Sequence, residues 1–576
     1  MNQKLENILN VSLDATEDEL RKADSLSTGY NWRDNTWEII VKYSGSLESI
    51  RNRYNVYIKE LLNYYAIIVA DKATIELISQ EDVIDYVEKP KSLYYQIERT
   101  KTAACVGNVR AGGGILSGKG VIVGVIDTGI DIFDNAFRNS DGTTRILNIY
   151  DQTTGEKYDK QSIDEYIKLN EDLSGGTFSY DNAPGVDNIM HGTDVSYIAA
   201  GSLGVAYEAD IIAVKMGYSI NNQFPRTTSL MDAIDYVIRK AIEYRKPVAV
   251  NISYGCNYGA HNGNTLLESF IDDISKSYRC VICVGSGNEA DKAIHFGGII
   301  NTGQVQTAYL SVGEYQSAID IQIWKNYWDT IDVMLINPRG EQIGIITEGR
   351  INRYETYNTE IITLLGEPSP YNIYQEIYIN LIPKTDYILS GIWQIVLMAG
   401  SIRAGEYNIW LPSSQALGYA TAFNNPTADG TITIPATARN CIAVGAYNAY
   451  TNSYATFSGR GFDNSIRNVN AGVKPDITAP GVDISIARQR GNDIIYRNVT
   501  GTSYAVPVVT GAAALLMQWG IVMGNDRFMY GEKLKAALID GSKPVGLVGI
   551  TGNDNHPDPR TGWGAVCLMN TLNKIL

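Results

Sequence analysis

The sequence is poor in cysteine and histidine, and its basic residues do not balance its acidic ones. Among 576 residues there are six cysteines and four histidines. That is too few cysteines for a disulfide framework in so long a chain. Lysine and arginine total 48 against 63 aspartates and glutamates, so the formal net charge is −15. We therefore expect no nucleic-acid partner, because phosphate binding requires a basic surface.

The sequence also lacks the usual membrane and export signals. No uninterrupted apolar run reaches the ~18 residues that a membrane-spanning helix needs, so we expect no membrane partner. The beginning of the chain, MNQKLENILN, has no basic stretch followed by an apolar one, unlike a secretory signal peptide. We therefore expect a soluble protein, made inside the cell and not exported by the usual signal.

Two of the cysteines, Cys280 and Cys283, have the CxxC spacing of some metal and redox sites. They lie in RCVICVGSGN, which has the apolar content of a buried strand, where residues three apart point to opposite faces. Buried free thiols are therefore the favoured interpretation, and a metal or redox site is the alternative.

Apolar segments alternate with helical ones over about 97–300 and again over 416–576. VIVGVIDTG, IIAVKM, PVAVNISYG and CVICVGSGN are apolar runs that end in polar residues or glycine, and LMDAIDYVIRKAIEYR is a helical segment between them. This alternation predicts an α/β fold with a doubly wound parallel sheet that is covered on both faces.

Two other regions have different patterns. Residues 1–96 mix strand-like segments such as TWEIIVKY with a helix start at Thr16 and Glu19, which have capping-box spacing, and so predict a small α+β unit. Residues 301–415 contain short alternating segments such as AIDIQIW and GIWQIVLMAG, typical of a β-sandwich. This block therefore reads as an insertion within the α/β domain.

Three polar residues stand where strands end or helices begin. Asp127 follows the strand VIVGVI, His191 begins HGTDVSYIAAG, and Ser503 lies in GTSYAVP at a helix start. Loops at the carboxyl ends of parallel strands meet at one edge of the sheet, so all three could converge. Alone, Asp127 could be a turn residue, and His191 and Ser503 could cap helices. Together they are the types that nucleophilic catalysis needs: a serine, a base that takes its proton, and a carboxylate that orients the base.

VIDTGID, HGTDVSYIAAG and GTSYAVPVVTGAAALL resemble the three signature segments of the subtilase family of serine proteases, in the same chain order. The resemblance implies a subtilisin-like serine endopeptidase with Asp127, His191 and Ser503 as catalytic triad. It implies that Asn288, in GSGN, stabilises the oxyanion. Backbone strands of the specificity pocket are implied at two tripeptides: Ser253, Tyr254, Gly255 and Gly285, Ser286, Gly287.

The resemblance also carries departures from the family pattern. Asp194 stands where subtilases usually have a second histidine, in HGTHV, a position outside the triad. SLGVAYEADIIAVKM follows the histidine segment directly, where many extracellular subtilases have a longer, calcium-binding loop. We therefore expect no metal and no organic cofactor.

The first 96 residues resemble a subtilase propeptide, an intramolecular chaperone whose C-terminal tail lies in the active site. KSLYYQ fits such a tail, extended and suited to strand addition, so we expect autocleavage between Gln96 and Ile97 and the propeptide as a bound partner. The alternative is that 1–96 stays attached as a structural domain.

The combination of propeptide, missing calcium loop and inserted β block is similar to the Csp subtilases of clostridial spore-formers. That similarity implies a jelly-roll insertion, association with spores, and a protein substrate such as the precursor of a cortex-lytic hydrolase. A general intracellular or gut-bacterial subtilase with other substrates is one alternative, and a propeptide-plugged regulatory scaffold is another. Sugar binding by the inserted block is a further alternative, because it contains Trp324, Trp328, Trp393 and Trp410.

Overall fold

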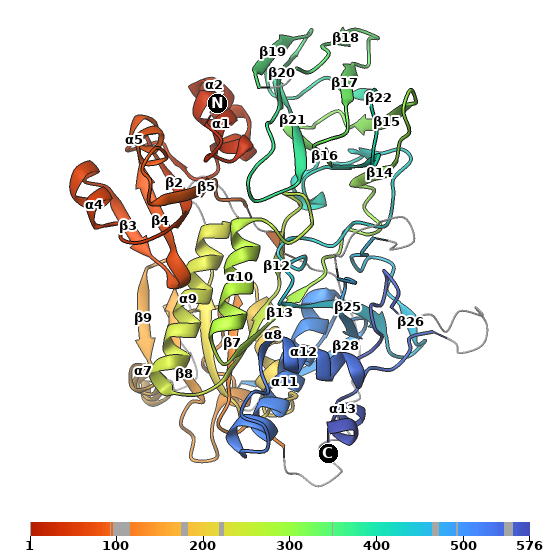
Figure 1. The fold of residues 1–576 in the computed structure, drawn as a ribbon. Coiled ribbons are helices and arrows are strands. Elements are labelled where there is room, and N and C mark those ends of the chain that lie inside the picture. The colour runs from red at the N-terminus through yellow and green to blue at the C-terminus, as the bar shows by residue number, and fades with distance from the viewer. Residues whose placement is uncertain are drawn as a thin grey trace.

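The structure, a computed structural model, describes residues 2–92, 94–95, 116–173, 182–217, 224–347, 349–462, 472–490, 493–546 and 557–575. Three parts are visible in Figure 1: an N-terminal unit in red and orange, a large α/β domain below it, and a β insertion in green and teal beside it. The N-terminal unit contacts both of the other parts.

A nine-stranded sheet organises the α/β domain, and its central strands are parallel. The order along the sheet is β26-β25-β13-β11-β7-β10-β8-β9, with β27 paired to β25. The strands are β7 (Ile122–Asp127), β8 (Ile146–Asp151), β9 (Glu156–Asp159), β10 (Asp210–Lys215), β11 (Val248–Ile252), β13 (Cys280–Gly285), β25 (Ile442–Asn448), β26 (Ser453–Tyr454) and β27 (Ile477–Pro480).

Helices cover both faces of this sheet, as the sequence predicts. Along β7, Val123 and Val125 enter one apolar core and Ile122 and Ile126 enter the other, because successive side chains of a strand point to opposite faces. The first core includes α8 and α11, and the second includes α9 and α10. The helices of this domain are α7 (Lys160–Leu173), α8 (His191–Ala200), α9 (Thr227–Tyr244), α10 (Leu266–Ser277), α11 (Thr502–Met517), α12 (Gly531–Asp540) and α13 (Leu568–Ile575).

The two cysteines of the CxxC lie on β13 and point to opposite cores, Cys283 to the first and Cys280 to the second. Both are free and fully buried, and burial raises the pKa of each thiol to about 12. The prediction of buried free thiols is confirmed.

One helical segment among the described residues, Thr502–Val522, is long and apolar enough to cross a membrane by length and composition. However, 83% of its most apolar window is buried inside the protein, as in the core helix of a compact domain. Its apolar surface therefore packs against the central sheet.

The N-terminal unit is a five-stranded antiparallel sheet with short helices, and the predicted capping box of Thr16 and Glu19 begins α2. Its strands are β1 (Tyr30–Asn31), β2 (Thr36–Tyr43), β3 (Tyr57–Glu60), β4 (Tyr65–Ala70) and β5 (Ile84–Glu88). Its helices are α1 (Asn7–Asp14), α2 (Glu17–Lys22), α3 (Asp24–Ser27), α4 (Glu48–Tyr54) and α5 (Lys72–Ile78).

The two faces of this small sheet bind different neighbours. Ile40 and Ile67 join the core of α9 and α10, whereas Ile39 and Ile68 face the opposite core. That opposite core also contains side chains of the β insertion: Ile362, Leu364, Tyr378 and Ile382. The N-terminal unit and the insertion therefore share one apolar core.

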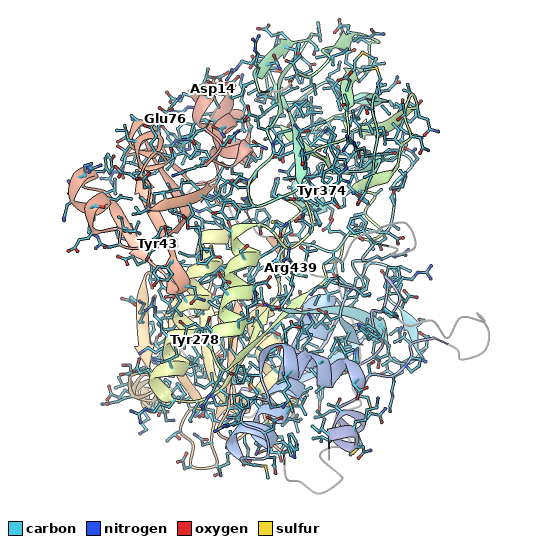
Figure 2. The ribbon with its side chains drawn as sticks, viewed as in Figure 1. Asp14, Tyr43, Glu76, Tyr278, Tyr374 and Arg439 are labelled. Carbon is cyan, nitrogen blue, oxygen red and sulfur yellow. The ribbon has the colours of Figure 1, made fainter. Side chains whose placement is uncertain are left out.

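Polar contacts also join the N-terminal unit to the β insertion. Arg353 of the insertion forms ion pairs with Asp14 at 2.8 Å and with Glu19 at 2.9 Å. Asp14 lies on the side of the N-terminal unit that faces the inserted strands (Figure 2). Glu19 is buried, but Arg353 and Asp14 are partly exposed, so solvent weakens these ion pairs and the apolar core contributes most of the contact free energy.

A cluster of largely buried ionisable groups lies where the three parts meet. Lys91 forms ion pairs with Glu88 and, at 2.7 Å, with Glu6. Glu88 accepts the backbone N–H of Leu266 at 2.7 Å. Glu376 of the insertion accepts from the side chain of Gln322 at 2.7 Å. We call Glu6, Glu88, Lys91 and Glu376 the junction cluster. Burial raises the pKa of Glu376 to about 8 and that of Glu6 to about 7.

The β insertion consists of two antiparallel sheets whose facing side chains form one core. The first sheet contains β14 (His295–Ile299), β16 (Ile319–Asn326), β19 (Ile351–Glu355), β20 (Thr359–Leu365), β21 (Tyr374–Pro383) and β23 (Glu406–Trp410). The second contains β15 (Val305–Val312), β17 (Ile331–Ile336), β18 (Gln342–Ile343), β22 (Gly391–Ala399) and β24 (Ala422–Phe423).

The sheets extend past the predicted range 301–415 at both ends, because β14 and β24 complete their edges. These short segments, HFGGI and AF, have too few alternating apolar residues to be recognised as strands in the sequence. The more specific jelly-roll connectivity stays a prediction.

The tryptophans of the insertion serve mainly its core. Trp393 and Trp410 are each 1% exposed and belong to the core, and Trp324 packs against it. Trp328 is 38% exposed. A sugar platform needs several exposed aromatic faces, so the tryptophan pattern favours the core interpretation over sugar binding.

Candidate active site

Asp127 and His191 are in direct contact. Asp127 is the last residue of β7, and His191 is the first residue of α8. The Nδ1 atom of His191 lies 2.6 Å from Oδ1 of Asp127, and both side chains are buried. Burial of the imidazole disfavours its charged form, but the carboxylates of Asp127, Asp187 and Asp194 outweigh this and raise the pKa of His191.

Glycine allows this close approach of strand and helix. A Cβ atom at Gly192 would lie 2.4 Å from the carbonyl oxygen of Gly129, inside any tolerable contact. The glycines of the segments DTG and HGT therefore let α8 begin directly against the loop that follows β7.

Asp187 is a functional-site residue that the sequence analysis missed. It is fully buried; its Oδ1 accepts from the hydroxyl of Thr128 at 2.7 Å and from the N–H of Met190 at 2.8 Å. Its Oδ2 accepts the N–H and hydroxyl of Thr193, both at 2.8 Å. Asp187 therefore ties the residue after Asp127 to the first turn of the helix that carries His191. Its place, four positions before His191 in VDNIMH, is the sequence signal that could have revealed it.

Ser503 lies in the first turn of α11 and is fully buried. Its backbone carbonyl accepts a hydrogen bond from the hydroxyl of Ser253 at 3.3 Å. The ring of Tyr504, the next residue, lies 5.3 Å from the ring of His191. The first turns of α8 and α11 therefore meet beside the end of β7, where the sequence predicted that Asp127, His191 and Ser503 converge.

Asn288 is oriented toward a role as hydrogen-bond donor. Its Oδ1 accepts from both the N–H and the hydroxyl of Thr502, each at 3.1 Å. Its Nδ2 is buried and has no hydrogen-bond partner within the described part of the chain. Such a reserved donor beside Ser503 fits a site that stabilises negative charge on a bound carbonyl oxygen.

The two predicted pocket segments come at the ends of the neighbouring parallel strands β11 and β13. Gly285 ends β13, and Ser253 precedes the short strand β12 (Tyr254–Gly255). Gly287 has φ of +94°, and a Cβ there would lie 2.6 Å from Thr433. Ser286 accepts the N–H of Thr433 at 3.0 Å through its carbonyl oxygen. The segment at Thr433 is therefore a wall of this site that the sequence analysis did not name.

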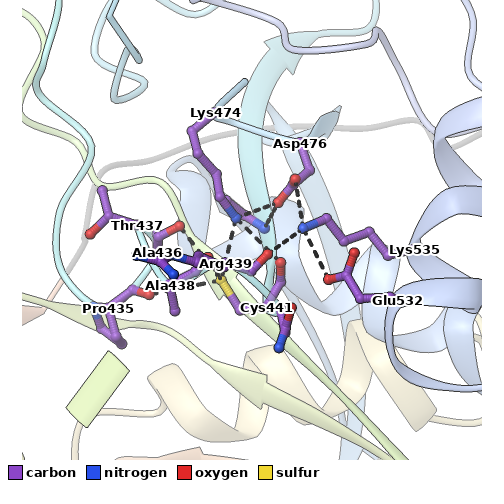
Figure 3. A network of polar contacts seen from close by, with 12 residues as sticks. Pro435, Ala436, Thr437, Ala438, Arg439, Cys441, Lys474, Asp476, Glu532 and Lys535 are labelled. Carbon is purple, nitrogen blue, oxygen red and sulfur yellow. Dashed lines mark hydrogen bonds and ion pairs between the residues drawn. The ribbon is translucent and has the colours of Figure 1, made fainter. Parts of the chain in front are cut away.

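A polar network holds the segment that follows Thr433 (Figure 3). Asp476 forms ion pairs with Lys474 at 2.7 Å and Lys535 at 3.1 Å, and accepts the N–H of Ala443 at 2.7 Å. Lys535 also donates to the carbonyl oxygen of Arg439 at 2.6 Å. The network therefore links β25, β27 and α12 behind the wall.

The end of the N-terminal unit enters the site as a strand. β6 (Tyr94–Tyr95) pairs antiparallel with β12, with Tyr95 opposite Tyr254 and Tyr94 opposite Gly255. The predicted strand addition by KSLYYQ is confirmed for these two residues. Gln96 and Ile97, the predicted cleavage site, lie outside the described residues, just beyond β6.

Comparison with known proteins agrees with this geometry. The profile of the subtilase family matches residues 118–368 and 404–564, which is more than half of the chain. The chain belongs to the subtilase family. It is therefore a subtilisin-like serine peptidase. The profile of the Csp protease B prodomain matches residues 3–91, which form the N-terminal unit.

A solved structure has the same architecture over most of the chain. The CspB protease of Clostridium perfringens superposes with a TM-score of 0.74 and 34% sequence identity, covering 82% of this subtilase and 96% of that chain. The subtilase-type proteinase RRT12 of Saccharomyces cerevisiae is 33% identical over 128 residues, 22% of this chain and 23% of its own. Subtilisin-like protease 10 of Arthroderma otae is 34% identical over 120 residues, 21% of this chain and 27% of its own. The matches therefore span about a quarter of these two curated relatives.

Proposed function

We propose that this subtilase is an endopeptidase that forms an acyl-enzyme on Ser503. His191 removes the hydroxyl proton as Ser503 attacks the peptide carbonyl, then returns it to the leaving amine. A water molecule, activated by the same base, then hydrolyses the acyl-enzyme. The observation that carries this proposal is the 2.6 Å contact between Asp127 and His191, because it holds the base in one orientation and stabilises its charged form.

The tetrahedral intermediate carries a negative oxygen that needs donors. The buried Nδ2 of Asn288 and the backbone N–H of Ser503 are the groups proposed for this role. Two hydrogen bonds from Thr502 hold the Asn288 amide in place before substrate arrives. A donor that is already positioned needs no reorganisation during the reaction.

We propose that the first substrate is the chain itself, cut between Gln96 and Ile97. The pairing of β6 with β12 supports this, because it lays the chain along the strand that follows Ser253, one or two residues before the proposed bond. The core that the N-terminal unit shares with the insertion supports continued binding after the cut.

We further propose a protein zymogen of spore germination as natural substrate, such as the precursor of a cortex-lytic hydrolase, and a spore-associated location. The support is the match of the N-terminal unit to the Csp protease B prodomain, together with the likeness to the CspB protease. The test is to incubate purified enzyme with such a precursor and to map the new N-terminus. A single cut that depends on Ser503 is expected, and an unchanged precursor beside a fluorophosphonate-reactive enzyme would point to other substrates.

The same strand pairing also favours a second candidate function, a regulatory scaffold plugged by its own prodomain. In that case β6 never leaves β12, and no added protein is cleaved. The two candidates separate in one assay: a scaffold leaves Ser503 unreactive toward a fluorophosphonate, whereas the enzyme reacts.

A further inference from the structure

Asp194 is a buried carboxylate one helical turn after His191 on α8. It is 0% exposed, and both of its carboxylate oxygens are buried and accept no hydrogen bond within the described residues, so ion pairing alone compensates the charge. A buried carboxylate is costly unless cations compensate it, so the partners of Asp194 indicate what this residue does.

Those partners are two arginines from a hairpin that lies far away in the sequence. The hairpin consists of β28 (Ile484–Arg490) and β29 (Asp493–Val499). Nε of Arg488 lies 3.3 Å from Oδ1 of Asp194, and Nε of Arg497 lies 3.1 Å from Oδ2.

The hairpin register brings both arginines to one face. Arg497 pairs with Ile486, two residues before Arg488 on the opposite strand. Side chains two residues apart on a strand share a face, and diagonal neighbours across an antiparallel pair lie within reach of long side chains. Both guanidinium groups therefore converge on one carboxylate.

The hairpin leads directly into the nucleophile segment. Thr500 and Gly501 follow β29, and α11 with Ser503 comes next. The hydroxyl of Thr500 accepts the N–H of Asp483 at 3.0 Å, and the N–H of Gly501 donates to Gly481 at 2.8 Å. The base of the hairpin is thus fixed to the start of α11, while β28 packs against α8.

We infer that Asp194 is a positioning residue: with Arg488 and Arg497 it fastens the hairpin that precedes Ser503 to the helix that carries His191. This inference rests on the proposed function. The contact joins α8, which carries the base His191, to the hairpin that leads to the nucleophile Ser503, and so fixes the distance between the two residues. A displacement of about 1 Å in such a site can lower the rate on the order of a hundredfold.

The contact also sets the electrostatic surroundings of His191. The titratable groups that face the imidazole within the described residues are Asp127 from β7, Asp187 from the preceding loop, Asp194 from α8 and Tyr504 from α11. Arg488 and Arg497 of the hairpin are paired with the carboxylate of Asp194 and oppose its charge. Burial raises the pKa of Asp194 to about 6 against the opposing effect of the arginines, so the carboxylate is charged at neutral pH.

Two substitutions move the titration of His191 in opposite directions. Asp194→Asn removes a negative charge and leaves two cations, so the pKa of His191 falls. Activity is lost on acidification when His191 becomes protonated, so this acid limb of the pH–rate profile moves to lower pH. Arg497→Met removes a cation, so the pKa of His191 rises and the acid limb moves to higher pH. Each shift is on the order of one pH unit or less, the size expected from one charge a few ångström away.

The experiment measures the rate of labelling by a fluorophosphonate between pH 5 and 9 for wild type and variants. At its own optimum Asp194→Asn is expected to react about tenfold more slowly than wild type, and Asp194→Glu to recover part of the loss. Arg353→Met is the matched control, because Arg353 is 40% exposed and Arg497 is 36% exposed, and both form ion pairs with carboxylates. The control is expected to keep the wild-type profile.

If Asp194 has only a structural role, Asp194→Asn will melt at a lower temperature, but its folded fraction will be labelled at the wild-type rate and with the wild-type acid limb. That result overturns the inference. If Asp194→Asn does not fold, Arg497→Met decides, because its side chain is partly exposed. If the acid limb of the labelling rate of Arg497→Met lies at the same pH as that of wild type, the inference is contradicted and the proposed function still stands. A wild type that does not label overturns both.

Discussion

The candidate active site and the junction cluster both contain largely buried polar groups. They differ in whether those groups all have partners within the fold. In the junction cluster Lys91 joins Glu6 and Glu88, and Glu376 accepts from Gln322, so each group has a partner within the fold. Beside Ser503, Asn288 keeps one buried donor without a partner among the described residues.

An unpartnered buried donor distinguishes a functional site from a structural junction better than a shifted pKa does. The pKa of Glu376 is raised from 4.5 to about 8, a larger departure than that of Asp194 from 3.8 to about 6, yet Glu376 lies at a contact between parts of the fold. Burial alone produces such shifts. What marks the candidate site is a reserved donor beside the proposed nucleophile, Ser503, near the carboxyl ends of parallel strands.

The largest effect that sharpens this comparison is expected at Asn288. Asn288→Ala removes the reserved donor, so kcat should fall by about 10²–10³, the loss known for such a donor in subtilisin, another member of the family. KM should change little, because the donor acts on the transition state. Steady-state kinetics on a cleaved peptide measures both values.

The matched control is Asn380, another buried asparagine, whose Nδ2 donates to Ser25 of the N-terminal unit at 3.1 Å and to the hydroxyl of Tyr378 at 2.8 Å. Asn380→Ala should reduce stability and leave kcat near the wild-type value. If the two variants lost kcat equally, the distinction between reserved and satisfied donors would fail.

A second effect, on stability rather than rate, is expected at Glu376. Because burial raises its pKa from 4.5 to about 8, the folded state holds a proton that the unfolded state has released between these values. The contribution of Glu376 to stability therefore falls as pH rises from about 4.5 to about 8, with a slope of at most about 1.4 kcal/mol per pH unit.

Glu376→Gln keeps the shape and removes the titration, so its gain in stability over wild type should increase with pH across that window. Urea unfolding at pH 5 and pH 8.5 compares the two proteins. An advantage that stays constant or shrinks toward pH 8.5 would show that Glu376 is charged in the folded protein.

The smallest effect is expected at Arg353, whose ion pairs cross from the insertion to the N-terminal unit. Because Arg353 and Asp14 are partly exposed and only Glu19 is buried, Arg353→Ala should weaken retention of the cleaved prodomain by about 1 kcal/mol. Dissociation of the fragment on a sizing column measures this. Complete release would mean that ion pairs, rather than the shared apolar core, hold the prodomain.

Much of the fold could be predicted because its signals are local. The alternation of Ile39 and Ile40 between two cores, the capping box at Thr16 and the strand end at Asp127 each depend on neighbours in sequence. The same holds for the buried cysteines of β13 and for the helix starts at His191 and Ser503.

The parts that could not be predicted depend on partners brought together by topology. The carboxylate of Asp194 could be recognised as a departure, but its arginines lie on a hairpin near the other end of the α/β domain. The junction cluster likewise joins Glu6 to Lys91, while Glu376 comes from the insertion. No periodicity links such positions.

The central claim is that Ser503 reacts as a nucleophile in the protein as it is made. The most direct measurement is mass spectrometry of wild type and Ser503→Ala, each purified alone and treated with a fluorophosphonate. We predict that the wild type appears as two fragments cut after Gln96, with one adduct on the peptide that contains Ser503. Ser503→Ala should appear as one intact, unmodified chain. An intact, unmodified wild type, or a Ser503→Ala protein cut at the same bond, would contradict this account.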